Sequence, residues 1–200
     1  MKLIISATSK ITSEGAYQNG HLVVSNEHDE AGRFFKDCYT HLAITYPKYY
    51  KMDRLSQLCF LCAEFLLVGH DRFKDYDRGQ IAVVIENYHA SLVSDQKHQI
   101  SISDRDNYFP SPSVFVYTLP NIMLGELCIR HQINGEATCL LPENKDFFCK
   151  YIRALFDGGA SECCIAGRVD FTDSAYGAEL YLIENSAMVG QHIAKFESIF

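Results

Sequence analysis

The spacing of apolar positions changes along the chain, and with it the predicted secondary structure. Lys2–Ile11 alternates loosely and is rich in β-branched side chains, which favours a strand. Positions 55, 58, 59, 62 and 66 are apolar at helical spacing. Asp53 before them is a good N-cap and Gly69 after them a good helix stop, so a helix is predicted between the two. Because this helix is apolar around most of its circumference, we expect it to be largely buried.

Along the rest of the chain, segments with a strand-like pattern alternate with segments that have a helix-like pattern. The unbroken apolar run Ile81–Ile85 is typical of a strand covered on both faces. Within a helix that Asn121 caps, Glu126 is predicted to face Arg130, and Gly125 to allow a close backbone approach. Strands that alternate with helices predict an α/β layered fold. The predicted strands are 21–25, 80–86, 136–141, 162–167 and 177–184; the predicted helices are 31–46, 121–131, 144–157 and 186–200; 108–120 reads as a connecting segment.

The composition and net charge limit which classes of protein this chain can belong to. With 200 residues, 48% hydrophobic and 22% charged, the chain suits one domain, residues 1–200, with a core that needs no disulfides. Its net charge of −7 argues against nucleic acid as the main partner, because phosphate binding needs a basic face. No stretch approaches the roughly 18 apolar residues that cross a bilayer. The first apolar run ends at Thr8, too early for a signal peptide, so we expect a cytoplasmic protein.

Cysteine spacing does not predict a metal site. Cys59 and Cys62 lie three apart on the buried helix, but no second ligand pair accompanies them. Cys163 and Cys164 are adjacent in a predicted strand, so their side chains should point to opposite faces. The polar residues of loop 26–30 could bind a metal, but a polar cluster in a loop is more often simply exposed to water. We therefore expect reduced, structural cysteines, no metal and no cofactor.

Several segments, in order and spacing, resemble one known family. The most specific is Pro112–Asn121 followed by Gly125-Glu126 and Ile129-Arg130. The others are Met52–Gln57 with Ala63-Glu64, Gly135, Ala154–Gly167 and Gly177–Glu184. Together they resemble the N-terminal half of the β-ketoacyl synthases, enzymes of the thiolase-like fold that extend acyl chains on carrier proteins. The resemblance implies half of a thiolase-like fold, with a mixed, mostly parallel sheet layered with helices.

The chain departs from this family at the catalytic cysteine. Active members carry it just after the strand that matches Glu136–Leu141, at the start of the next helix, where the helix N-terminus lowers the thiol pKa. Here 140–146 contains no cysteine, and Glu143 and Asp146 add negative charge that would raise a thiol pKa. Cys139, within the strand, and Cys149, over a turn into the helix, remain the weak nucleophile candidates.

The second departure concerns the histidines. The family's two catalytic histidines come from a second, homologous half, and this chain ends where that half would begin. The resemblance therefore implies a non-catalytic accessory subunit, similar to chain-length factors, in fatty-acid, polyketide or polyene biosynthesis. Two alternatives stay open: an acyltransferase or condensing enzyme that uses Cys139 or Cys149, and a stand-alone module that binds acyl thioesters or carrier protein.

The resemblance also suggests partners. Family members dimerise along the strand that matches Glu136–Leu141, so this edge is the predicted interface of a homodimer, or of a heterodimer with a full-length ketosynthase. An acyl carrier protein is the other candidate partner. Tyr117, Thr118 and Asn121 are the candidate binding residues.

The predicted helix 144–157 carries a polar stripe of Asp146, Lys150, Arg153 and Asp157. In the two-half enzymes the matching helix lies between two sheets and is mostly small and apolar. Burying four charges there would cost several kcal/mol each unless they were paired. We therefore expect the stripe to face water; a charged docking face is the alternative. The apolar positions on another face are Phe148, Ile152 and Leu155.

Overall fold

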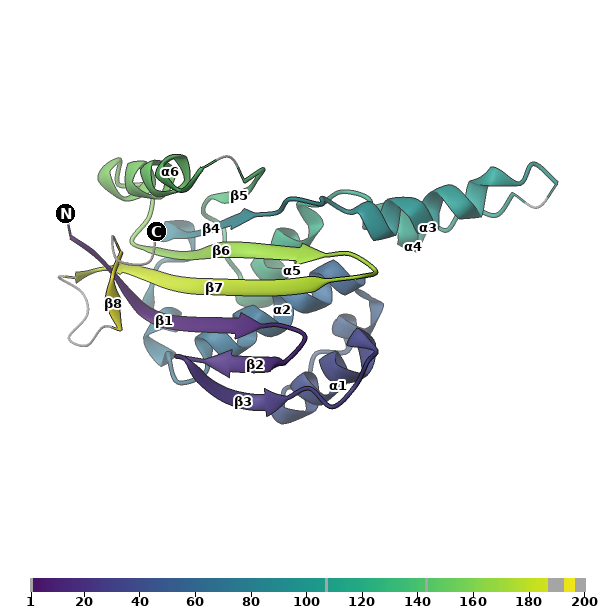
Figure 1. The fold of residues 1–200 in the computed structure, drawn as a ribbon. Helices are drawn as coiled ribbons and strands as arrows, with labels where there is room; N and C mark the ends of the chain where they lie inside the picture. The colour runs from purple at the N-terminus through teal and green to yellow at the C-terminus, as the bar shows by residue number, and fades with distance from the viewer. Residues whose placement is uncertain (1, 107, 143, 187–192, 197–200) are drawn as a thin grey trace.

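The computed structural model describes residues 2–106, 108–142, 144–186 and 193–196. An eight-stranded sheet, ordered β3-β2-β1-β7-β6-β4-β5 with β8 against β1, forms the centre (Figure 1). The strands are β1 (Leu3–Ile11), β2 (Gly15–Gln18), β3 (His21–Ser25), β4 (Ile81–Glu86), β5 (Ala137–Leu140), β6 (Cys163–Phe171), β7 (Tyr176–Asn185) and β8 (Ala194–Lys195). The helices are α1 (Ala31–His41), α2 (Arg54–Leu67), α3 (Leu92–Ser103), α4 (Pro112–Val116), α5 (Ile122–His131) and α6 (Lys145–Asp157), with 3₁₀ turns at Pro47–Lys51, Asp71–Asp75 and Arg78–Gln80.

The sheet is mixed, as expected of an α/β fold, but it is not mostly parallel. β4 pairs parallel with β5 and β6, whereas the other described pairings are antiparallel. The reason is the connections. A parallel return needs a long crossover, which helices supply between β4 and β5 and between β5 and β6. Short turns join β1 to β2, β2 to β3 and β6 to β7, so these neighbours pair antiparallel.

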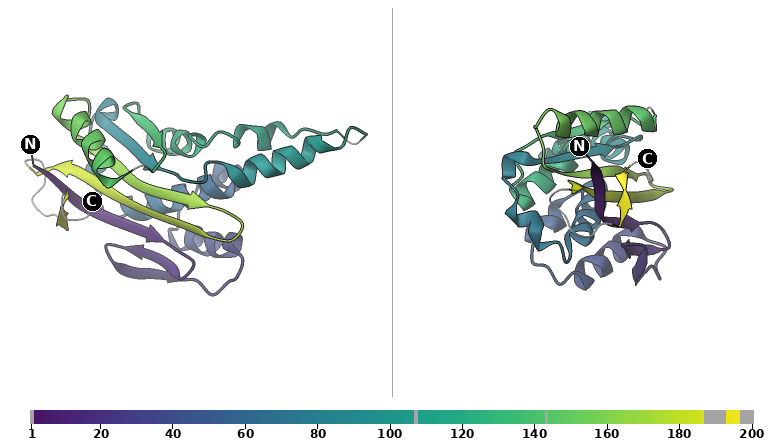
Figure 2. Two further views of the ribbon diagram at one scale, coloured as in Figure 1. Left: turned by 45° about the horizontal axis from the view of Figure 1, so that its top comes forward. Right: turned by 90° about the vertical axis from the view of Figure 1, so that its left-hand side faces the viewer.

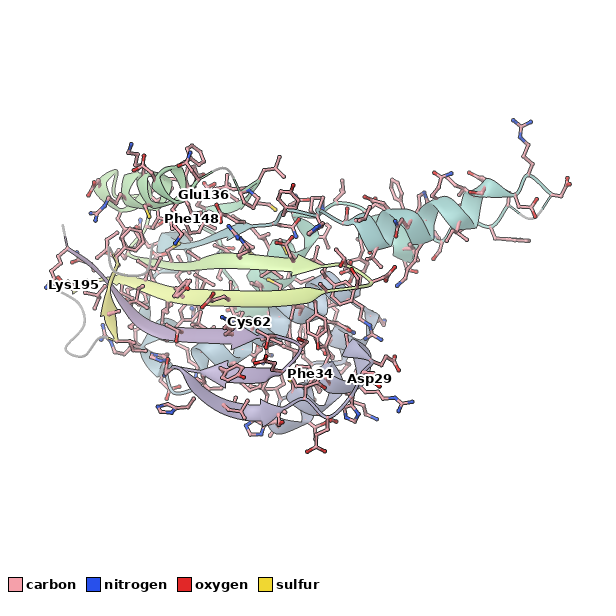
Figure 3. All side chains as sticks on the ribbon, in the orientation of Figure 1. Asp29, Phe34, Cys62, Glu136, Phe148 and Lys195 are labelled. Carbon is pink, nitrogen blue, oxygen red and sulfur yellow. The ribbon has the colours of Figure 1, made fainter. Side chains whose placement is uncertain are left out.

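Helices cover both faces of the sheet. α1, α2 and α5 lie on one face and α6 on the other (Figures 1 and 2). The α2 face holds the larger core, and α2 is buried along nearly its whole length, as predicted. Cys163 belongs to this core and Cys164 to the core under α6, which confirms that the two thiols point to opposite faces. Phe148 lies on the α6 side and Cys62 on the α2 side (Figure 3).

Three of the four stripe residues of α6 face water, as predicted, whereas Arg153 is half-buried, with its guanidinium carbon 5.5 Å from the Phe196 ring centroid. Phe148 and Ile152 are buried against the sheet, while Asp146, Lys150 and Asp157 are exposed. Lys150 and Asp146 form a surface ion pair with 2.6 Å between Nζ and Oδ2. The helix is therefore amphipathic: within the described part of the chain, its apolar side packs against the sheet.

The described residues 88–106 and 108–120 form an arm that projects from the body at the carboxyl end of β4 (Figures 1 and 2). It contains α3, which the sequence pattern did not predict, and α4, which lies in the expected connecting segment. The pattern could not predict α3 because the helix has no continuous core-facing stripe: its buried residues are Val93 and Ser94. An amphipathic period arises only where a helix packs on a core.

Three further expectations are corrected. The predicted helix 31–46 ends earlier, at His41. Of the predicted helix 186–200, residues 187–192 and 197–200 lie outside the described residues, and Ala194–Lys195 is a strand paired with β1. Gly125 has open space where a Cβ would lie, so it serves no close backbone approach. No described helix combines the length and the apolar character that crossing a bilayer requires.

Candidate functional site

The carboxyl ends of β4, β5 and β6 meet at the end of the sheet from which the arm leaves. From β4 the chain reaches β5 through α5 on one face, and from β5 it reaches β6 through α6 on the other. In α/β sheets, ligands bind outside the carboxyl ends of strands where successive connections go to opposite faces. The β5–α6 turn is therefore the candidate site by topology as well as by the sequence resemblance.

A cavity of about 240 Å³ lies beside the first turn of α6. Arg168 and Glu86 pair across it, with 2.9 Å between Nη2 and Oε2. Burial, and then the neighbouring Glu179 carboxylate, raise the pKa of Tyr181, so this phenol stays protonated at neutral pH. The cavity is thus small, and its lining mixes both signs of charge. The residues that line it are Glu86, Lys145, Phe148, Gly167, Arg168, Glu179 and Tyr181.

An asparagine caps the start of α6, which is the region where the sequence resemblance implied a nucleophile. Asn144 is the N-cap of α6, and its Oδ1 accepts the Phe147 N–H at 2.7 Å. Asparagine is among the best N-caps, so the sequence of this turn favours helix initiation. An amide does not act as an acyl acceptor in the way that a thiolate does.

The two candidate thiols lie away from the helix N-terminus. Cys139 is half-buried on β5 and faces the α2 core, and Cys149 is half-buried against the core under α6. Burial raises the pKa of the Cys139 thiol, and the Asp170 carboxylate adds to this. Burial likewise raises the pKa of Cys149. A nucleophilic thiol needs the opposite shift, because the thiolate is the reactive form.

The three candidate binding residues lie between the end of α4 and the start of α5, and they do not line the β5–α6 cavity. The Tyr117 hydroxyl donates to Glu126 Oε1 at 3.0 Å, and burial raises the pKa of this phenol. The Thr118 hydroxyl donates to the Phe115 carbonyl at 2.7 Å. Asn121 is the N-cap of α5, as predicted, but without a side-chain hydrogen bond to the helix. Their binding role stays a prediction.

Glu126 and Arg130 do not pair with each other as the sequence suggested. Lys48 Nζ lies 2.6 Å from Glu126 Oε2. Arg130 instead pairs with Glu64 on α2, with 2.8 Å from Nε to Oε1 and 3.3 Å from Nη2 to Oε2. Both carboxylates are buried, so each takes the cation that tertiary packing brings to it rather than its neighbour on the helix.

The Glu64 cluster, one buried carboxylate with two half-buried basic side chains, is a set of charges that sequence reasoning missed. His131 Nε2 lies 3.3 Å from Glu64 Oε1, and the Arg130 guanidinium stacks 5.0 Å from the Tyr46 ring centroid. Burial alone would raise the pKa of Glu64, but the contacts with His131 and Arg130 outweigh burial and lower the pKa. The cluster joins α2 to α5. The sequence signal was Ala63-Glu64 and Ile129-Arg130, two matched segments whose charges are complementary.

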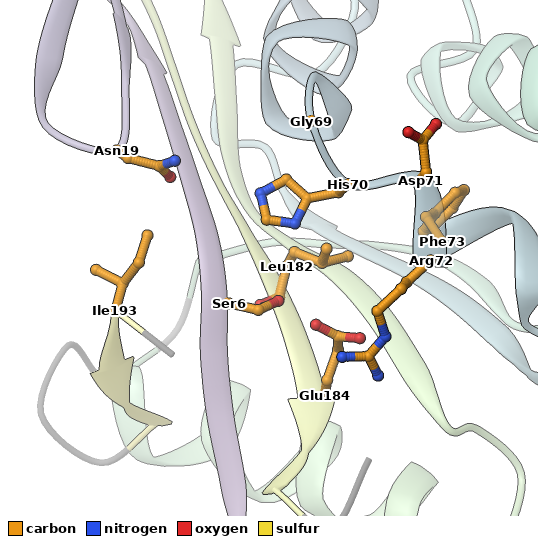
Figure 4. A pocket seen from close by; sticks show the side chains of 10 residues that line it. All are labelled: Ser6, Asn19, Gly69, His70, Asp71, Arg72, Phe73, Leu182, Glu184 and Ile193. Atoms are coloured by element: carbon orange, nitrogen blue, oxygen red, sulfur yellow. The ribbon is translucent and has the colours of Figure 1, made fainter. Parts of the chain in front are cut away.

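A larger cavity, of about 550 Å³, lies at the opposite end of β7 (Figure 4). Glu184 is 3% exposed there and accepts a short hydrogen bond from the Tyr76 hydroxyl. The His70 ring points into this space, and Ser6 and Leu182 form part of its wall (Figure 4). Burial, with the Glu184 contact, raises the pKa of Tyr76. No sequence motif pointed here, because these residues come from distant parts of the chain.

Among the described residues, no three His, Cys, Asp or Glu side chains gather as a metal site. Within the polar loop 26–30, His28 Nε2 is 2.7 Å from Asp37 Oδ2. This histidine has a carboxylate partner on α1, so its place in the loop has a structural explanation.

β5 forms the edge of the sheet, with β4 as its neighbour among the described strands. The Val83 N–H donates to the Glu136 carbonyl, and the Asn87 N–H to the Leu140 carbonyl. Backbone groups alternate along a strand, so those of Ala137 and Cys139 face the open edge. No charged side chain lies in β5, although edge strands are commonly protected by charge or proline.

Comparisons with known proteins match on structure alone. No family model matches the chain, and no curated protein matches its sequence. The ishigamide ketosynthase/chain length factor is 15% identical with a TM-score of 0.70, over 96% of this chain and 64% of that one. A type II polyketide synthase acyl-carrier protein in complex with its ketosynthase bound to the hexaketide is 12% identical with a TM-score of 0.63, over 94% of this chain and 63% of that one. A ketosynthase (ApeO) in complex with its chain length factor (ApeC) from Xenorhabdus doucetiae is 13% identical with a TM-score of 0.59, over 93% of this chain and 80% of that one.

These similarities define the fold. The chain has a ketosynthase-like, thiolase-like fold and amounts to about half of it. It spans less than two thirds of the length of the first two structures. The fold expected from the sequence resemblance is thus confirmed, whereas at these identities the chemistry depends on the residues of this chain.

Proposed function

We propose that this protein is a non-catalytic, ketosynthase-like accessory subunit of acyl-chain assembly in fatty-acid, polyketide or polyene biosynthesis. The observation that carries the proposal is the β5–α6 turn. Asn144 caps the helix there, and the thiols nearest along the chain, Cys139 and Cys149, have raised pKa values. A fold that transfers acyl groups through a thiolate then lacks its acceptor at the place where the helix N-terminus would activate one.

The open edge of β5 supports a role in assembly. Its outward backbone groups and uncharged side chains suit pairing with the edge strand of another chain. A second copy of this chain and a full-length ketosynthase are the two partners that would bring such a strand. An acyl carrier protein is the further candidate, since one solved complex of similar fold contains a carrier protein with its ketosynthase.

The test is the intact mass of the purified protein after incubation with acyl-CoA and with acylated carrier protein. We expect no covalent adduct. A stoichiometric acyl adduct that maps to Cys139 or Cys149, and is lost on replacing that cysteine with serine, would overturn the proposal. It would support a condensing enzyme or acyltransferase instead.

A further inference from the structure

A buried carboxylate forms part of the wall of the cavity of about 550 Å³ near the end of β7 (Figure 4). It belongs to Glu184, which at 3% exposed is the least exposed aspartate or glutamate among the described residues. Removing a carboxylate from water is costly unless partners compensate, and the Tyr76 hydroxyl, which donates to Oε1, is one such partner. An ionised carboxylate has about four acceptor positions, so Glu184 keeps the capacity to accept from a donor that enters the cavity.

The end of α2 adds negative potential to the same cavity. Gly69 and His70, which follow the helix, form part of the cavity wall. The carbonyl end of a helix carries about half a negative charge, and a nearby cation is stabilised by it. The last turn of α2, all of it described, contains no basic residue. The helix end and Glu184 therefore both favour a positively charged group in this space.

A cationic side chain lies in the same wall. Arg72 is exposed on the 3₁₀ turn Asp71–Asp75, and its side chain extends toward Glu184 (Figure 4). Asp71, the other acidic residue of the lining, pairs with Lys74, with 2.7 Å between Oδ1 and Nζ. Arginine carries five donors in a planar fork, so it can hold a ligand carboxylate in addition to a partner within the protein. The cavity thus offers one anchor of each sign.

Two anchors of opposite sign select against ligands that carry a single charge. An ammonium ion that approaches Glu184 also approaches the Arg72 guanidinium, and a lone carboxylate that approaches Arg72 also approaches Glu184. A zwitterion whose ammonium and carboxylate groups lie side by side matches both anchors, and such complementarity gives specificity. α-Amino acids have these two groups on one carbon atom.

Apolar side chains complete this part of the lining. Leu182 and Phe73 are buried, and Ile193 is exposed. The Ser6 hydroxyl beside them already donates to the Leu182 carbonyl at 3.3 Å. Contact with these side chains would remove the aliphatic part of a ligand from water, which favours binding. The volume of the cavity lies within the range of about 300–1,000 Å³ that is typical of small-molecule sites.

We propose that this cavity binds an α-amino acid with an aliphatic side chain, its ammonium group on Glu184 and its carboxylate on Arg72. The cavity lies at the end of β7 opposite the β5–α6 turn, so the proposal goes beyond the accessory role and does not depend on it. An acyl adduct on a cysteine would refute that role and leave this site untouched.

The test is isothermal titration calorimetry of the purified protein with L-leucine and two analogues. 3-Methylbutylamine lacks the carboxylate of leucine, and 4-methylpentanoic acid lacks its ammonium group. We expect saturable binding of leucine with a dissociation constant below about 1 mM, and at least about tenfold weaker binding of each analogue. Absence of such leucine binding would overturn the proposal. Equal binding of either analogue would overturn it too, because one anchor would then play no part.

Variants of the two anchors test the assignment of the groups. Arg72→Gln should weaken leucine binding by about tenfold and leave the weak binding of the amine unchanged. The matched control is Arg33→Gln, because Arg33 is an exposed arginine on α1 outside the cavity lining; it should leave leucine binding unchanged. Glu184→Gln should weaken the binding of leucine and of the amine alike, with circular dichroism as the check on folding. If this variant does not fold, Arg72→Gln and the analogues still decide, and unchanged leucine binding in Arg72→Gln would overturn the proposal.

Discussion

Asp53 and Ser94 join the core of the protein to its arm. The Ser94 hydroxyl donates to Asp53 Oδ2 at 2.7 Å, and Asp53 Oδ1 accepts the Ser56 N–H at 2.9 Å. A single carboxylate therefore caps α2 and anchors α3. The Ser91 hydroxyl, which donates to the Thr118 carbonyl, is a second hydrogen bond near the base of the arm.

Replacing Asp53 with alanine should lower the free energy of unfolding by about 2 kcal/mol. The lost N-cap contributes about 1 kcal/mol and the lost hydrogen bond to Ser94 about another 1 kcal/mol. Ser94→Ala should cost only the second part. Urea denaturation measures both, with Ser103→Ala as the control because the exposed Ser103 hydroxyl bonds only within the arm. Equal losses for Asp53→Ala and Ser94→Ala would contradict the shared-carboxylate explanation.

The Glu64 cluster should make stability fall in acid. The pKa of Glu64 is lowered in the folded protein, so its contribution is present above the unfolded pKa of about 4.3 and is lost as pH falls through the folded pKa. Glu64→Gln should therefore flatten the dependence of unfolding free energy on pH below about pH 5. Urea titrations at several pH values measure this slope. An unchanged slope would mean that other carboxylates carry the acid sensitivity.

Removing the partner of Glu64 should cost more than removing its charge. Arg130→Met leaves a buried carboxylate without its bidentate cation, and such losses reach about 3 kcal/mol or more at neutral pH. In the Glu64→Gln, Arg130→Met double variant the coupling should recover part of this loss. A double variant with strictly additive losses would show that the two side chains contribute independently.

Gly167 should not tolerate a side chain. Its φ is 157°, and a Cβ there would lie 2.0 Å from the Glu179 carbonyl oxygen on the paired strand β7. Gly167→Ala should lower the free energy of unfolding by about 3 kcal/mol, since neither backbone can move without breaking the β6–β7 ladder. Gly125→Ala is the matched control, because open space surrounds that helical position and it should stabilise by up to about 1 kcal/mol. Equal effects at both positions would contradict the steric explanation.

Hydrophobic period predicted the elements that touch the core. The sequence predicted α2, β4, α6 and β7 because each of them buries one stripe or face. Its buried apolar residues therefore recur every 3.6 residues in a helix or every two residues in a strand. The sequence pattern did not find α3, α4, β2 or β8. No continuous buried face constrains the helices of the arm, and strands as short as β2 and β8 show no clear period.

Some features of the candidate site could likewise be seen in the sequence, and others only in the structure. That the β5–α6 turn lacks a cysteine is a fact of the sequence, whereas the capping role of Asn144 is seen only in the structure. The raised pKa values of Cys139 and Cys149 follow from burial, which only the packed structure sets. Glu126 and Arg130 show the same limit: their helical spacing predicted a pair, and each found a different partner across the fold.

The sequence by itself thus determined the α/β class, the buried helix, the thiol-free turn and the polar face of α6, because these depend on local order and period. The tertiary structure decided the antiparallel share of the sheet, the partners of the buried charges, the free edge of β5 and the projection of the arm. Those features depend on which distant segments meet. A linear pattern records that a residue is buried or exposed, but not what lies against it.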